Sequence, residues 1–141
     1  MKKISATRES VTHKAVIRCA PEACEKCGHV ADGSGRVKFF FTVGIIDGKP
    51  VELFLHMDRS GSTIDGFAKC WALAVSLCLR EGVPLEKVVE KFSFQQFEPR
   101  GFTENAQIRT AQSVVDYVAR WLAREFLDNA VNHRPEEREV V

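Results

Sequence analysis

The sequence predicts a single α+β domain in which an antiparallel sheet packs on a buried central helix. Up to Met57, apolar and polar side chains alternate, which is the period of a strand with one buried face. Beyond Met57, apolar side chains recur every three or four residues, which is the period of a helix. The length of 141 residues, of which 45% are hydrophobic and 28% charged, is typical of one globular domain. We expect this domain to span residues 10–129, between a flexible leader at 1–9 and a charged tail at 130–141.

The sheet is expected to contain an N-terminal strand, Ser10–Arg18, and a β-hairpin, Arg36–Met57. The pair Asp47-Gly48 lies midway along the hairpin and tolerates the positive φ angles of a two-residue turn. One face of these strands is consistently apolar, namely Val11, His13, Ala15, Ile17, Val37, Phe39, Phe41, Val43, Ile45, Val51, Leu53, Leu55 and Met57. The other face of the hairpin carries Phe40, Ile46 and Phe54, so we expect a helix or another subunit to cover part of it.

Three helices are expected after the hairpin. The first, from about Ile64 to Arg80, is apolar nearly all round, with Asp65, Lys69, Ser76 and Arg80 as a narrow polar stripe, so we expect it to be central and buried, with Cys70 and Cys78 as core residues. Gly82 is expected to end this helix as its C-cap, and Pro84 to begin a short second helix that runs to about Phe92. A long C-terminal helix is expected from about Asn105 to Asn129.

Composition indicates the cellular compartment, the class of partner and the state of the cysteines. The N-terminus lacks the apolar segment of a secretory signal, and the most apolar stretch, Trp71–Leu79, is too short to span a bilayer, so we expect a cytoplasmic protein with no membrane partner. The net charge of +1 disfavours nucleic acid as a partner. It also counts against a zinc module that binds nucleic acid. Five cysteines, an odd number, indicate reduced thiols or metal ligands and not a disulfide framework.

The loop at residues 19–35 carries the sharpest chemical signal. In Cys24-x-x-Cys27-Gly-His29, two thiolates are spaced to share one tetrahedral metal ion. Cys19 is a third candidate ligand, and His29 or His13 is the fourth, a set that suits a structural zinc. The alternatives are a flexible loop with free thiols and a redox pair, because Cys-x-x-Cys also forms disulfides.

The start of the first helix is a candidate phosphate site. Ser60, Gly61, Ser62 and Thr63 would offer unpaired N–H groups, and Arg59 would add a second contact. The alternative is an ordinary helix N-cap in which Ser60 or Ser62 satisfies the first amides. Arg100, in a turn after Glu98-Pro99, is a further candidate phosphate ligand, or it pairs with Glu98 or caps the last helix.

Eight short strings, in order, resemble one family. Together they are similar to the TSCPD domain, the C-terminal domain of adenosylcobalamin-dependent (vitamin B12-dependent) ribonucleotide reductases. The resemblance runs from about Arg8 to Leu127, and residues 18–35 depart from it. The strings are Arg8–Lys14, Thr42–Gly44, Asp47–Pro50, Gly61–Ile64, Ser76–Leu77, Gly82–Glu86, Phe97–Thr103 and Ser113–Tyr117.

The resemblance implies a role in deoxyribonucleotide synthesis without the catalytic part. The family's reductase barrel, radical cysteine and cobalamin site have no counterpart in these residues, so we expect a stand-alone, non-catalytic accessory protein with no cobalamin. It would bind a nucleotide, or a nucleotide-like small molecule, or dock on a reductase chain. The alternative is a small oligomeric protein that binds or sequesters nucleotides without any reductase. A homo-oligomer is expected because one small domain has too few helices to cover both sheet faces.

Overall fold

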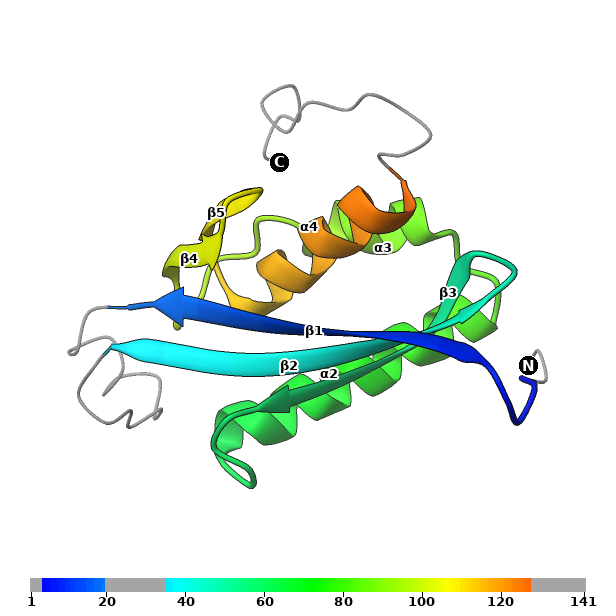
Figure 1. The fold of residues 1–141 in the computed structure, drawn as a ribbon, viewed down its shortest axis with the longest axis horizontal. Helices are drawn as coiled ribbons and strands as arrows, with labels where there is room; N and C mark the ends of the chain where they lie inside the picture. The colour runs from blue at the N-terminus through cyan, green and yellow to red at the C-terminus, as the bar shows by residue number, and fades with distance from the viewer. Residues whose placement is uncertain (1–3, 20–34, 128–141) are drawn as a thin grey trace.

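A computed structural model describes residues 4–19 and 35–127 as a five-stranded antiparallel sheet with three helices (Figure 1), which confirms the predicted α+β class. The strands lie in the order β3-β2-β1-β4-β5. In these ranges, no helix has the length and hydrophobicity needed to cross a membrane. The elements are β1 (Glu9–Arg18), β2 (Arg36–Ile46), β3 (Lys49–Met57), α2 (Thr63–Arg80), α3 (Leu85–Phe92), β4 (Gly101–Asn105), β5 (Ile108–Ala111) and α4 (Val114–Phe126).

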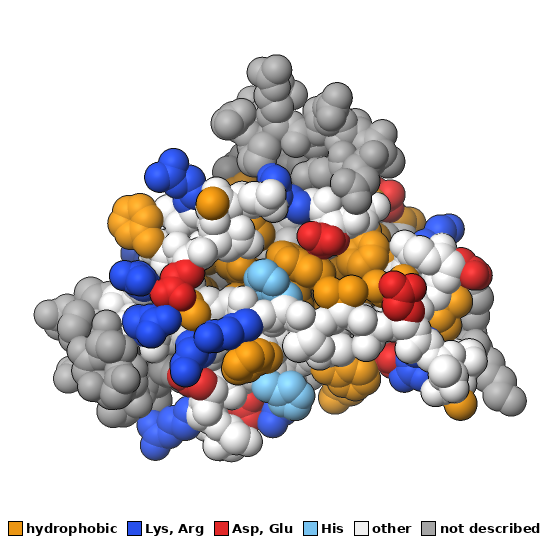
Figure 2. Space-filling model, in the orientation of Figure 1, with side chains coloured by type: hydrophobic (Ala, Val, Ile, Leu, Met, Phe, Trp, Pro, Cys, Tyr) orange, Lys and Arg blue, Asp and Glu red, His pale blue; other side chains and the backbone are white. Residues whose placement is uncertain are grey.

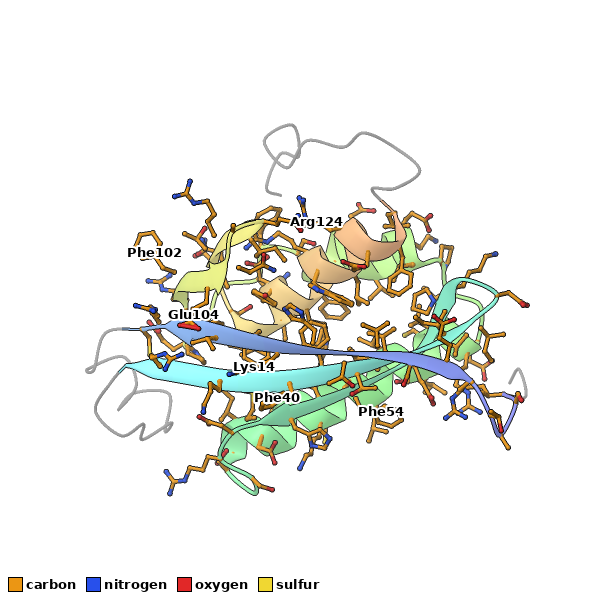
Figure 3. All side chains as sticks on the ribbon, viewed as in Figure 1. Lys14, Phe40, Phe54, Phe102, Glu104 and Arg124 are labelled. Carbon is orange, nitrogen blue, oxygen red and sulfur yellow. The ribbon has the colours of Figure 1, made fainter. Side chains whose placement is uncertain are left out.

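The predicted hairpin forms as β2 and β3. Asp47 and Gly48 have φ angles of 53° and 74°, so both central residues of the turn are left-handed, as a two-residue hairpin requires. The expected inner face is buried: Phe39 and Phe41 are fully covered and their rings contact a tyrosine of α4. The outer face is open, since Phe40 and Phe54 are 40% and 45% exposed and no helix within the described ranges covers them (Figure 3).

The C-terminal helix is shorter than predicted. Residues 101–111, which we assigned in part to this helix, form the β4–β5 hairpin, with Gly101 opposite Ala111. Ile108 and Ala111, spaced like helix neighbours, are instead both buried in the hairpin. The Asn105 side chain accepts a hydrogen bond from the Gln107 N–H at 2.9 Å, a local turn that competes with helix formation.

Helix α2 packs on the sheet, but only one side of it is buried. Two residues of the expected polar stripe, Asp65 and Ser76, face β3, an edge strand whose outer backbone groups they bind. The Met57 N–H donates to Asp65 Oδ1 at 3.0 Å, and the Leu53 N–H donates to Ser76 Oγ at 2.8 Å. These two side chains therefore hold α2 along the edge of the sheet.

Because Asp65 and Ser76 face β3, an apolar side of α2 faces solvent, contrary to the expectation of a helix buried all round. Phe67, Leu73 and Leu77 are 75%, 65% and 54% exposed. Cys70 is exposed, contrary to the prediction of a core residue, whereas Cys78 is half-buried and packs against the core. The sequence pattern indicated burial, and the single chain supplies it for one half of the helix only.

Candidate functional site

A groove opens along β1 where its neighbouring strand ends. β1 pairs with β2 along its whole length, but with β4 only at Ile17 and Arg18, which lie opposite Thr103 and Phe102. The edge of β1 from residue 9 to residue 16 therefore has no strand beside it within the described part of the chain. A groove of about 520 Å³ follows this edge. Figure 2 shows hydrophobic side chains and a histidine at the surface, in the centre of the view. The lining residues are Val11, His13, Lys14, Ala15, Val16, Glu104, Asn105, Ala106, Gln107, Tyr117, Trp121 and Glu125.

Aromatic rings form the floor of this β1 groove. Helix α4 contributes Tyr117 and Trp121, both buried. The His13 ring lies 5.8 Å from the Tyr117 ring, nearly parallel to it, and 5.3 Å from the Trp121 ring. Behind them, the Phe41 ring meets Trp121 edge-on at 5.0 Å. Since these rings pack on one another, the floor is a rigid apolar surface.

A chain of hydrogen bonds crosses the floor. Asn105 Nδ2 donates to the Tyr117 hydroxyl at 3.0 Å, and this hydroxyl lies 2.8 Å from His13 Nε2. Because an amide NH₂ group only donates, the tyrosine oxygen accepts from Asn105, and its own proton is available to His13 Nε2 in the tautomer that leaves this nitrogen unprotonated. Burial lowers the pKa of His13 and outweighs the opposing charge of Glu125. Burial raises the pKa of Tyr117, so both side chains are neutral at neutral pH.

The state of His13 predicts a pH-dependent stability. In the unfolded chain the imidazole binds a proton below its ordinary pKa of 6.5, whereas the folded pKa lies lower. Between these two values the unfolded state binds more protons, so the free energy of unfolding falls as the pH falls. We expect a lower urea midpoint at about pH 5.5 than at about pH 7.5, and a smaller difference in His13→Gln. An equal difference in both proteins would show that His13 is not held neutral.

The predicted phosphate site is arranged as a helix cap. The Ser62 hydroxyl accepts from the Asp65 N–H at 3.2 Å, which is the N-cap alternative. The Gly61 N–H donates to Asp65 Oδ2 at 3.0 Å, so this buried carboxylate already occupies an anion position in the turn. Arg100 pairs at 3.6 Å with the carboxylate two residues before it. Phosphate binding by residues 59–63 and by Arg100 stays a prediction.

The predicted zinc site lies largely outside the described residues. Cys24, Cys27 and His29 fall in the range 20–34, which is not described. Cys19, at the end of this range, is buried, and its N–H donates to the Gly35 carbonyl at 2.8 Å. No group of three metal-ligating side chains occurs within residues 4–19 and 35–127. Zinc therefore stays a prediction.

The β1 groove was not recognised from sequence. The sequence places His13 on the inner face of its strand and offers it as a candidate zinc ligand, whereas in the structure it lines the groove and is hydrogen-bonded to Tyr117. Asn105 and Tyr117 were both placed on one long helix, which separates their side chains by about three turns. The hairpin and helix that replace it bring them together. The available signal was Ser113-x-x-Asp116, a pattern that starts helices and would have moved the helix start.

Comparison with known proteins gives a consistent set of relatives. Residues 8–126 match the model of the TSCPD domain family. A vitamin B12-dependent ribonucleotide reductase of Rhodopirellula baltica is 43% identical over 122 residues, which cover 86% of this chain and 10% of the relative. The reductase of Streptantibioticus cattleyicolor is 49% identical over 76 residues, 54% of this chain and 13% of the relative. That of Agrobacterium fabrum is 43% identical over 82 residues, 57% of this chain and 6% of the relative. No solved structure is significantly similar to the chain.

Proposed function

The chain belongs to the TSCPD domain family, and from this membership we propose that it is a non-catalytic accessory protein of deoxyribonucleotide metabolism that docks on a ribonucleotide reductase chain. Its sequence matches 6–13% of the length of the three reductases compared above. In those relatives the matching segment is covalently joined to the rest of the reductase. A surface that such a segment uses within one chain is suited to the same contact between two chains.

The edge of β1 that has no partner strand among the described residues is the observation that carries this proposal. Backbone N–H and C=O groups along an open strand edge can pair with an extended segment of another protein, which adds a strand to the sheet. The groove lies beside this edge, in the position that β4 would occupy if it paired with the whole of β1. Its floor, with Tyr117 and Trp121, offers apolar contact to alternate side chains of the added strand. Glu125 at the rim favours a basic side chain in the docking segment.

Nucleotide binding without a reductase is the less favoured function. In the turn at residues 59–63, the Gly61 N–H donates to the Asp65 carboxylate of the same chain. Fewer N–H donors therefore remain for a phosphate. Among the described residues that line the β1 groove, Lys14 is the one cation, and it is accompanied by Glu104 and Glu125. This balance of charge does not favour a nucleoside di- or triphosphate.

Binding to a defined reductase tests the proposal. The probe is the Rhodopirellula baltica reductase from which the matching segment has been deleted. We expect saturable binding in biolayer interferometry, and we expect Val11→Glu to weaken it at least tenfold, because this substitution places a carboxylate on the apolar wall of the groove. The matched control is Val83→Glu: Val83 is 36% exposed against 38% for Val11, but it does not line the groove.

Two results would contradict the docking function. One is an equal loss of affinity in both valine variants, which would place the contact elsewhere. The other is the absence of reductase binding together with calorimetric binding of a deoxyribonucleotide, which would support the nucleotide-binding alternative. Circular dichroism of each variant establishes that it is folded before its affinity is compared.

A further inference from the structure

The exposed side of α2 is a continuous apolar surface. We call it the α2 stripe, and it consists of Gly66, Phe67, Cys70, Leu73, Ala74 and Leu77, all exposed. The spacing 67-70-74-77 alternates steps of three and four residues, so these side chains share one side of the helix. This is the spacing by which one helix packs against another along its length.

An apolar notch adjoins the α2 stripe. The notch has a volume of about 300 Å³ and lies beside the first half of the helix, between Phe67 and Phe97 of the segment before β4. Trp71 and Val115 contribute to its walls, and every residue that lines it is apolar. Phe97 is itself 45% exposed. The α2 stripe and the notch together form a docking surface, in which the stripe protrudes and the notch is an adjacent hollow.

We propose that a second copy of this chain covers the α2 stripe, with the two α2 helices packed antiparallel across a two-fold axis. The stripe carries no charged side chain from Gly66 to Leu77, so it can face its own copy without bringing like charges together. Its large side chains alternate with the small Cys70 and Ala74, which gives each copy both knobs and holes. A large side chain of one copy can enter the notch of the other.

Charge at the helix ends favours the antiparallel arrangement. Arg59 lies three residues before the N-cap Ser62 of α2, and Glu81 lies at its C-cap, one turn after Leu77 on the same side. Antiparallel packing brings Arg59 of one copy toward Glu81 of the other, and it opposes the two helix dipoles. Lys69, on the flank of the stripe, is already paired with Asp65 at 2.8 Å, so its charge is balanced within its own chain.

The size of the surface suits a dimer. A stable interface buries about 1,200 Å² or more in total, and a two-fold interface takes half of this from each copy. An 18-residue helix such as α2 is about 27 Å long, and contact along this length together with the notch supplies an area of that order. The outer face of the β2–β3 hairpin is a weaker candidate, because Phe40 and Phe54 are less exposed than Phe67 and Leu73.

Sedimentation equilibrium of the full chain at micromolar concentrations tests the dimer. We expect a wild-type dimer, and we expect Leu73→Glu and Leu77→Glu each to raise the dimer dissociation constant at least a hundredfold, because each substitution buries two carboxylates at the interface. Both positions are exposed in the single chain, so the variants should remain folded by circular dichroism. Phe54→Glu, on the outer face of the sheet, should remain dimeric.

The outcomes separate the dimer from reductase docking. A monomeric wild-type chain at about 100 µM, or a dimer that Phe54→Glu dissociates and Leu73→Glu does not, would overturn the proposed interface. So would a monomer whose binding to the segment-deleted reductase is lost in Leu73→Glu, because α2 would then contact the reductase. A monomeric Leu73→Glu that still binds the reductase supports the α2 dimer and leaves β1 as the docking edge.

Discussion

Replacement of Asp116 by alanine is expected to lower the free energy of unfolding by about 3–5 kcal/mol, because it removes the acceptor from a buried, charged network. Asp116 is fully buried at the start of α4. Its carboxylate accepts the Phe94 N–H at 2.6 Å and the Gln112 N–H at 2.8 Å, and it makes two hydrogen bonds of 2.9 Å with Arg120. The substitution would leave two partly buried amides and one guanidinium without this partner.

Urea unfolding followed by circular dichroism measures this effect. Arg120→Ala provides the matched control, since the carboxylate then keeps its two amide donors and loses the cation alone. We expect this control to destabilise the protein by less than Asp116→Ala does. If Asp116→Ala lowered the free energy of unfolding by under about 1 kcal/mol, the carboxylate would not be the link between α4 and the two segments that precede it.

Asp65 has the equivalent position in α2, and its removal is expected to have the second largest effect. Burial raises the pKa of this carboxyl, but hydrogen bonds from Lys69 and from the Gly61 and Met57 N–H groups outweigh it and hold the pKa at about 2. The unfolded value is 3.8, so the ionised form contributes about 2 kcal/mol at neutral pH. Because the folded pKa is depressed, this stability is complete above about pH 4 and is lost as the pH falls through about 2.

Asp65→Ala should therefore lower the free energy of unfolding by about 2–4 kcal/mol at neutral pH, including the lost acceptor for Met57. Its stability should also depend less on pH between about 4 and 2 than that of the wild type. Glu90→Ala, an exposed carboxylate on α3, is the control and should change stability by no more than about 0.5 kcal/mol. An unchanged pH dependence in Asp65→Ala would contradict the assigned role.

Both aspartates belong to the same sequence pattern, and both are buried. In Ser62-x-x-Asp65 and Ser113-x-x-Asp116, the serine accepts the N–H of the aspartate and the aspartate reaches back to earlier amides. Counting helix faces assigns a charged side chain to solvent. An assignment by helix face leaves out the backbone N–H groups of the preceding segment, and these groups are hydrogen-bond donors to the two buried carboxylates.

Local patterns were sufficient for the parts of the fold that local chemistry decides. The β2–β3 hairpin follows from strict alternation and from the Asp47-Gly48 turn, and the α2 helix begins within one residue of its expected start. The β4–β5 hairpin was missed because Ile108 and Ala111 satisfy a helical period as well as a strand edge. Their pairing depends on contact with β1, which no window of the sequence contains.

The candidate site depends even more on tertiary structure. The β1 groove exists because β4 pairs with only two residues of β1 and then turns into β5 after Asn105. The predicted phosphate turn was correct as a helix start, but the Asp65 carboxylate that fills it lies inside the helix. The apolar pattern of α2 predicts a helix buried all round, whereas one chain buries only one side of it.

Backbone amide hydrogen exchange of β1 tests the docking function most directly. Exchange is measured with and without the Rhodopirellula baltica reductase that lacks its matching segment. Strand addition predicts slower exchange at residues 9–16 when the reductase is present, no change in α3, and loss of the protection in Val11→Glu. Unchanged exchange along β1 in a complex that does form, or protection confined to residues 59–63 when a deoxyribonucleotide is added, would contradict docking at this edge.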